Sequence, residues 1–196
     1  ANLIVTLEGS FHGRTVAGMC MTAQAKIHQG FGPLLDHFHY IRPNDIEMLE
    51  KEMDQHGSEM CALVLELVQG EGGVRPLDAE YVKAARQLCD ENDVLLILDE
   101  IQTGMGRTGK LFAYEHFDIV PDAMTLAKGL GNGFPIGAVV IREDRADLIH
   151  PGVHGTTFGG NHLGARVAYE TLKIIVTRDI LDNVNALSDY FLRRLK

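Results

Sequence analysis

The chain has 196 residues, of which 45% are hydrophobic and 23% are charged, a composition that suits a folded globular protein and excludes intrinsic disorder. The formal net charge is −9 at pH 7 and the basic residues are scattered, so we expect no nucleic-acid partner. No apolar run is long enough to span a membrane, so we expect no membrane partner. The three cysteines have no C-x-x-C spacing and favour a reducing compartment, so we predict a cytoplasmic protein.

Five short apolar runs predict the strands of a parallel sheet. Several of them are apolar at every position, as expected when helices cover both faces of the sheet. In chain order, the runs are residues 3–7, 62–67, 94–98, 123–126 and 136–141.

Four amphipathic segments predict helices, which cover residues 45–55, 78–92, 161–176 and 179–195. In the second segment, Asp78 can cap the helix N-terminus. The alternation of strands and helices predicts an α/β fold with a mostly parallel sheet flanked by helices and right-handed crossovers. We expect one domain, which the last helix begins to leave.

Four loops of this fold are rich in glycine. They read GSFHGRT, QGEGG, EIQTGMGRTG and KGLGNG. Glycine lets a backbone approach a ligand closely, and ligands of α/β folds bind beyond the carboxyl ends of the strands. The four loops together indicate one shared pocket.

The segment VLLILDEIQTGMGRTGK, residues 94–110, allows more than one interpretation. A P-loop would use Gly104 to Lys110, but this motif needs Ser or Thr after the lysine, and position 111 is leucine. A dinucleotide-binding motif needs its first glycine directly after the strand, whereas residues 99–103 intervene here. A nucleotide-binding module on this loop is therefore kept as an alternative. The nine histidines form no H-E-x-x-H motif and have no clustered cysteines, so no metal site is predicted.

A further interpretation pairs Asp99, at the end of its strand, with Lys128. Lys128 is the only basic residue between Ile119 and Ile141, and it follows an apolar strand. A desolvated lysine is partly neutral and can form a Schiff base with an aldehyde. An aspartate near it can keep a pyridine nitrogen protonated. The pair therefore predicts pyridoxal 5'-phosphate as cofactor, with Lys128 and Asp99 as catalytic residues.

Five motifs, in order and spacing, resemble those of the class III pyridoxal-phosphate aminotransferases, most closely the acetylornithine/ornithine branch. They read SFHGRT, QGEGG, LDEIQTGMGRTG, AKGLGNGFPIGA and HGTTFGGN. Three positions depart from the usual family pattern, namely Leu67, Asn132 and His162.

The resemblance implies roles for the residues that precede the segment 94–110. Phe11 would lie against one face of the pyridine ring with His12 beside it, and Arg14 would bind the substrate carboxylate. Glu66 would set the hydrogen bonding around the aspartate. Glu71 would be the glutamate that pairs with a later arginine and moves aside when 2-oxoglutarate or glutamate needs that arginine.

The resemblance also implies roles for the later residues. Asp99 would bind the pyridine nitrogen and Gln102 would contact the ring hydroxyl. Lys128 would be the Schiff-base lysine and the proton carrier. Thr156 and Thr157 would bind the cofactor phosphate of the partner subunit, so a homodimer is expected.

The implied reaction moves the terminal amino group of N-acetylornithine, or of a related ω-amino acid, to 2-oxoglutarate by a ping-pong mechanism. Ornithine, succinylornithine and 4-aminobutyrate are alternative amino donors, and a non-catalytic dimerisation or folding unit is an alternative role for the fragment. Residues 1–178 are expected to be part of the large cofactor-binding domain of fold-type I transferases, without its N-terminal phosphate-binding segment. Residues 179–196 would begin the helix that leads to a C-terminal small domain, so the fragment alone is expected to be inactive.

Overall fold

The computed structural model describes residues 1–195, which divide into two compact units. Unit 1 comprises Ala1–Asp99 and Ile119–Ala123. Unit 2 comprises Glu100–Asp118 and the chain from Met124 onward.

Unit 1 is built on four parallel strands in the order β2-β1-β3-β6. Strand β1 (Leu3–Leu7) pairs with β2 (Phe38–Ile41) on one side and with β3 (Met60–Leu65) on the other. Strand β6 (Leu95–Asp99) pairs with β3. Val5, Leu63 and Leu96 are fully buried, so the centre of the sheet is the core of this unit.

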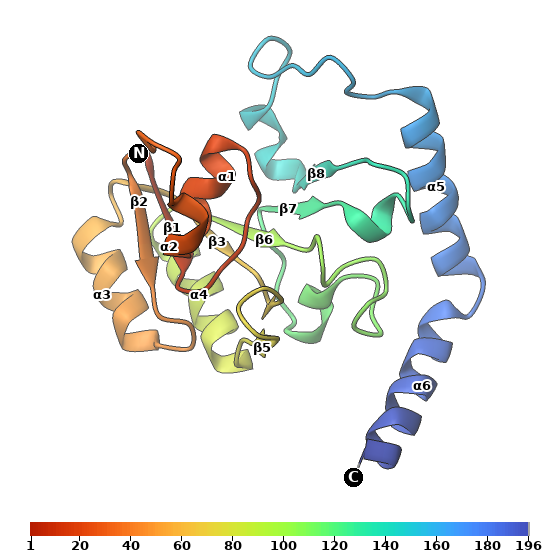
Figure 1. The fold of residues 1–196 in the computed structure, drawn as a ribbon. Helices are drawn as coiled ribbons and strands as arrows, with labels where there is room; N and C mark the ends of the chain where they lie inside the picture. Colours follow the sequence, from red (N-terminus) through yellow and green to blue (C-terminus); the bar gives the residue numbers. More distant parts are fainter. Residues whose placement is uncertain (196) are drawn as a thin grey trace. The chain divides into compact units, whose positions relative to one another are not determined.

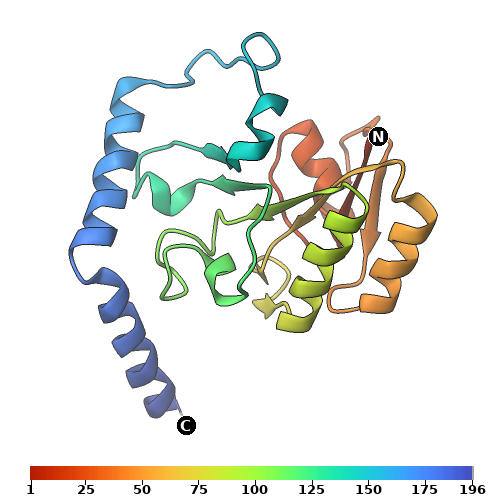
Figure 2. The ribbon, with the colours of Figure 1, turned by 180° about the vertical axis from the view of Figure 1, so that it is seen from behind.

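Helices cover both faces of this sheet (Figures 1 and 2). Helices α3 (Ile46–His56) and α4 (Ala79–Glu91) contact each other on one face. The short helices α1 (Val16–Met21) and α2 (Ala25–His28) lie on the other face. A two-stranded antiparallel hairpin, β4 (Val68–Gln69) and β5 (Arg75–Pro76), follows β3.

The helix caps differ in one respect from expectation. The predicted cap Asp78 precedes α4 but makes no side-chain capping hydrogen bond. Asp45 does cap α3, because its Oδ1 accepts a hydrogen bond from the Met48 N–H at 2.9 Å. A capping carboxylate satisfies one backbone N–H that the first turn of the helix leaves without a partner. The Asp78 backbone N–H instead donates to Asn44 Oδ1, which fixes the chain entering α4.

Unit 2 contains β8 (Ala138–Ile141) and, apart from its first residue, β7 (Ala123–Leu126). The two strands are neighbours in a sheet. Three short 3-10 helices connect its segments: η1 (Ala113–His116), η2 (Lys128–Leu130) and η3 (Glu143–Leu148). Two consecutive helices follow, α5 (His162–Thr177) and α6 (Ile180–Leu195). Asn161 caps α5 by accepting a hydrogen bond from the Gly164 N–H at 2.7 Å.

The predicted fold class is confirmed, since strands of a largely parallel sheet alternate with helices that flank it. Strands 3–7 and 123–126 were predicted with the bounds that the structure shows, and each of the four predicted helices is shifted by one residue at one or both ends. Strand β2 and helices α1 and α2 were not predicted. The expected domain boundary at residue 178 falls between α5 and α6 and stays a prediction. Among the described residues, no helix combines the length and the apolar composition needed to cross a bilayer.

Candidate active site

The loop that leaves β1 contains the first group of predicted site residues. Gly9 opens this loop with a φ of +78°, a conformation that glycine adopts without strain. The Phe11 N–H donates to Glu66 Oε2 at 2.9 Å, and the His12 N–H donates to Thr22 Oγ1 at 2.9 Å. These bonds fix the backbone of SFHGRT against the end of β3 and the end of α1.

His12 and Asp99 form a buried polar pair at the carboxyl end of β6. His12 Nδ1 lies 2.8 Å from Asp99 Oδ2, and the two side chains are 2% and 9% exposed. An ionised carboxylate only accepts hydrogen bonds, so Nδ1 is the protonated nitrogen in this contact. The other ring nitrogen, Nε2, is buried without a hydrogen-bond partner among the described residues. The pair thus holds the Asp99 carboxylate in a fixed orientation at the edge where ligands of such folds bind.

Glu66 lies directly after β3 and is 4% exposed. Burial raises the pKa of its carboxyl group, because the charged form loses hydration. The hydrogen bond from the Phe11 N–H opposes this shift, while the nearby Asp99 charge adds to it. Glu66 therefore links the Phe11 loop to the His12–Asp99 pair electrostatically.

The loop of the β4–β5 hairpin reads GEGGV and lies against the loop after β1. A Cβ atom on Gly72 would lie 2.8 Å from the Gly9 carbonyl oxygen, which explains why this position is a glycine. The buried side chain of Gln69 donates from Nε2 to the Glu8 carbonyl at 2.9 Å. Its Oε1 atom is buried without a hydrogen-bond partner among the described residues. Glu71, the predicted arginine partner, is exposed in this loop.

Arg14 is exposed and its guanidinium carbon lies 5.6 Å from the centre of the Phe11 ring. This separation permits a cation–π contact between the two side chains. The cation of Arg14 is thereby held beside the ring that the resemblance places against the cofactor.

Lys128 lies in unit 2 and starts the 3-10 helix η2. Its φ of +42° is unusual for a residue other than glycine, and such backbone strain is common at functional sites. The side chain is exposed, so the apolar residues around it in the sequence do not bury it. It borders an open pocket of about 520 Å³ whose other lining residues are Gly133, Phe134, Pro135 and Ile136.

The loop Gly104–Lys110 is folded on itself and is not shaped as a phosphate-binding cradle. The Gly106 N–H donates to the Leu111 carbonyl at 3.0 Å, and the Gly109 N–H donates to Gly106. Asn185 of α6 donates to the Gly109 carbonyl at 3.2 Å and fills the space that a side chain at Gly109 would need. A P-loop requires its backbone N–H groups to be free for the phosphates, so this arrangement weighs against a nucleotide-binding module.

Glu100 is the important residue of this region that sequence reasoning missed. It is 1% exposed and accepts hydrogen bonds from the Thr103 hydroxyl and from the backbone N–H groups of Ala113 and Tyr114. The carboxylate therefore fixes the turn that contains Gln102, which is half-buried. The only sign of this role in the sequence is that Glu100 follows Asp99 directly. The groups that donate to its carboxylate lie up to 14 positions away, so no local pattern predicts them.

The predicted site residues are thus divided between the two units. In unit 1, hydrogen bonds join Phe11 to Glu66 and His12 to Asp99. In unit 2, Thr156 and Thr157 are exposed in the loop between η3 and α5. Because Lys128 belongs to unit 2, its pairing with Asp99 stays a prediction. Taken separately, a fixed carboxylate suits a protonated pyridine nitrogen, and an accessible amine suits the aldehyde of pyridoxal phosphate.

Comparison with known proteins identifies the family. The family model described as aminotransferase class-III matches residues 2–196, and the chain belongs to this family. The acetylornithine aminotransferase of Caldanaerobacter subterraneus subsp. tengcongensis is 53% identical over 188 residues, which are 96% of this chain and 47% of that protein. The acetylornithine aminotransferase of Bacillus subtilis is 53% identical over 178 residues, covering 91% of this chain and 46% of that protein. The chain spans about half the length of these curated relatives.

Solved structures give the same result. The ornithine aminotransferase of Toxoplasma gondii ME49 superposes with a TM-score of 0.91 at 37% identity, covering 96% of this chain and 45% of that chain. An amine transaminase from an uncultivated Pseudomonas species, solved in its PLP-bound internal aldimine form, gives 0.92 at 29% identity, with 98% of this chain and 50% of that chain covered. The resemblance found in the sequence motifs is therefore confirmed.

Proposed function

We propose that the whole protein that carries this chain is a pyridoxal-phosphate-dependent aminotransferase. It moves the terminal amino group of N-acetylornithine, or of a related ω-amino acid, to 2-oxoglutarate in a ping-pong reaction. The observation that carries the proposal is the buried His12–Asp99 pair, because it holds a carboxylate in a fixed orientation at a strand end, and such a carboxylate can keep a pyridine nitrogen protonated. Membership of the class-III family and the names of the two similar acetylornithine aminotransferases support it.

The chain's own residues hold the cofactor in this proposal. The Asp99 carboxylate would bind the pyridine N–H, and the Lys128 amine would hold the cofactor through its aldehyde group and would carry a proton to and from the substrate carbon. The bound cofactor supplies an electron sink for the C–H bond that breaks. His12 orients Asp99, and Phe11 packs against the ring.

Substrate binding is assigned to the charged residues at the loops. Arg14 binds the substrate carboxylate through its planar guanidinium. Glu71 pairs with an arginine later in the whole protein and moves aside when 2-oxoglutarate binds that arginine. Glu66 supports the Phe11 loop through its hydrogen bond. Gln102 contacts the ring hydroxyl.

We further propose that the active form is a cytoplasmic homodimer. In this form Thr156 and Thr157 bind the cofactor phosphate of the partner subunit, which agrees with their exposure in the single chain. Residues 1–178 belong to the large domain, and residues 179–196 lead to the small domain.

The decisive test is the covalent assignment of Lys128. The whole protein is incubated with pyridoxal phosphate, reduced with borohydride, digested and examined by mass spectrometry. The cofactor mass is expected on the peptide that contains Lys128 and on no peptide of the Lys128→Ala variant. Lys110→Ala is the matched control, because Lys110 is an exposed lysine of the Gly104–Lys110 loop and its loss leaves the modification unchanged. A modification that persists in Lys128→Ala contradicts the proposal.

The amino donor is tested separately by single-turnover reactions. N-acetylornithine, ornithine, succinylornithine and 4-aminobutyrate are each mixed with the cofactor-loaded protein, and the rate of loss of the visible band of the bound cofactor is measured. We expect N-acetylornithine to give the largest second-order rate constant for this half-reaction. A larger value for another donor would reassign the substrate while leaving the Lys128 result intact.

A further inference from the structure

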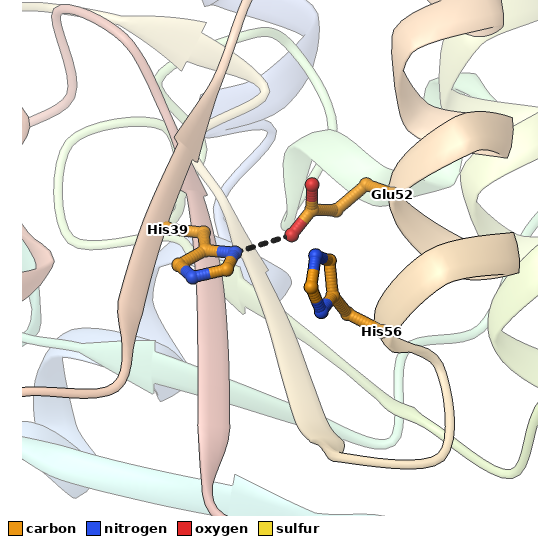
Figure 3. A group of neighbouring side chains, drawn as sticks. All are labelled: His39, Glu52 and His56. Carbon is orange, nitrogen blue, oxygen red and sulfur yellow. Dashed lines mark hydrogen bonds and ion pairs between the residues drawn. The ribbon is translucent and has the colours of Figure 1, made fainter.

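A cluster of metal-ligating side chains lies in unit 1, apart from the residues proposed to bind the cofactor. His39 projects from β2, the edge strand of the sheet, and Glu52 and His56 project from α3 (Figure 3). Residues four apart on a helix lie on the same face, so Glu52 and His56 present their side chains together. The cluster therefore joins two elements that the sequence separates.

The ligand atoms of the three side chains converge on one small space. His39 Nδ1 lies 2.6 Å from Glu52 Oε1, and the two imidazole rings meet edge to face with their centres 5.1 Å apart. One ligand atom from each residue lies within 4.8 Å of the others. In a zinc tetrahedron with bonds of about 2.0–2.1 Å, ligand atoms are roughly 3.3 Å apart. Small side-chain rotations by partly exposed residues reach this spacing.

The chemistry of the three groups favours a borderline divalent cation. Two imidazole nitrogens and one carboxylate oxygen are a ligand set that zinc uses in proteins, with water in the remaining position. Glu52 also borders an open pocket of about 390 Å³, which neither histidine lines, and His39 is exposed, so water reaches the cluster. The other charged residues that line this pocket are Arg42, Asp45, Glu47 and Lys51.

An ion pair alone does not account for the cluster. The pairing of His39 with Glu52 uses only one of the two histidines. No described side chain or backbone group hydrogen-bonds to the ring nitrogens of His56, although the ring points into the same space (Figure 3). A bound cation satisfies both imidazoles and the carboxylate at once.

We propose that His39, Glu52 and His56 form a binding site for one Zn²⁺ ion, with water completing the coordination. The bound ion ties the edge strand β2 to helix α3. The sequence predicted no metal site because the ligands come from two elements and follow no zinc motif. This proposal is independent of the aminotransferase assignment, since none of the three residues takes part in cofactor binding.

Zinc titration of the whole protein tests the site. The protein is stripped with a chelator, and Zn²⁺ is added in competition with a chromophoric chelator of known affinity. One equivalent is expected to bind this site with a dissociation constant in the micromolar range. His56→Gln and Glu52→Gln are each expected to weaken this binding at least about tenfold, because even loss of a group that supports a ligand costs about 10–100-fold.

The controls separate this site from other surface histidines. His150→Gln removes an exposed histidine of unit 2 and is expected to leave the affinity unchanged. Without metal, the variants should unfold at the temperature of the parent protein. At one zinc concentration, zinc should raise that temperature less in each variant than in the parent protein. Binding weaker than about 100 μM, or equal affinity in the parent protein and in both Gln variants, would overturn the proposal.

Discussion

Asp99 at the end of β6 lies 2.8 Å from His12 Nδ1, although 87 positions separate the two residues in the sequence. Both side chains are buried, and the contact joins the loop after the first strand to the last strand of the unit 1 sheet. Two parallel strands of one sheet bring their carboxyl ends to the same edge, which is why residues so distant along the chain meet.

The first prediction concerns this pair. Asp99→Asn is expected to lower kcat/KM for the amino donor by roughly 10²-fold or more, because a neutral amide cannot stabilise a positive pyridine nitrogen. His12→Gln is expected to lower kcat less and to leave KM for the donor nearly unchanged, since His12 acts through Asp99. Steady-state kinetics of the whole protein measure both effects, with the exposed His116→Gln as control. Wild-type kcat/KM in Asp99→Asn would rule out the assigned role.

The second prediction concerns the buried carboxyl group of Glu66. Burial raises its pKa above the ordinary value of 4.5, so the folded state keeps the proton at pH values at which the unfolded chain has released it. The stability that this group contributes is complete below pH 4.5 and is lost as the pH rises through the raised pKa.

Urea unfolding across this pH range measures the effect. The parent protein is expected to lose stability relative to Glu66→Gln as the pH rises, because the Gln side chain never ionises. Glu47→Gln, on the exposed face of α3, should show no such pH-dependent difference. Parallel stability curves for the parent protein and Glu66→Gln would show that the carboxyl group is not perturbed.

The third prediction concerns the buried ion pair of Arg86 and Asp122. Arg86 Nη1 lies 2.7 Å from Asp122 Oδ2, which also accepts the Leu96 N–H at 2.9 Å. Arg86→Met leaves a buried charge without its cation and is expected to cost about 3–5 kcal/mol. Arg42→Met breaks an exposed ion pair with Asp45 and is expected to cost less than about 1 kcal/mol. Equal losses for the two variants in chemical unfolding would contradict this reasoning.

The fourth prediction concerns the thiol of Cys89. Burial raises the pKa of this thiol to about 12, so only about one molecule in ten thousand carries the thiolate at pH 8. Iodoacetamide is therefore expected to leave Cys89 unmodified in the folded protein and to label it after unfolding in urea. Mass spectrometry of the peptides gives the readout at each time point. Labelling of folded Cys89 at the rate of a free thiol would show that the residue is accessible.

Local patterns in the sequence determined most of the secondary structure. The strands 3–7 and 123–126 were predicted with their observed bounds because short apolar runs report burial directly. Helices α1 and α2 were missed because six and four residues are too few to show a helical period, and strand β2 was missed because His39 interrupts its apolar run. The sequence motifs also identified the family, since five of them keep their order and spacing along the chain.

Only the tertiary structure decided which groups meet and how exposed they are. Three findings depend on the backbone positions of separate elements. They are the His12–Asp99 contact, the capping of α3 by Asp45 while Asp78 makes no cap on α4, and the hydrogen bonds that Glu100 accepts. Lys128 lies among apolar residues in the sequence and is nevertheless exposed. Hydrophobic periodicity reports local burial, whereas hydrogen bonds and exposure depend on three-dimensional distances that sheet topology sets. For the same reason the cluster of His39, Glu52 and His56 has no counterpart in any motif along the chain.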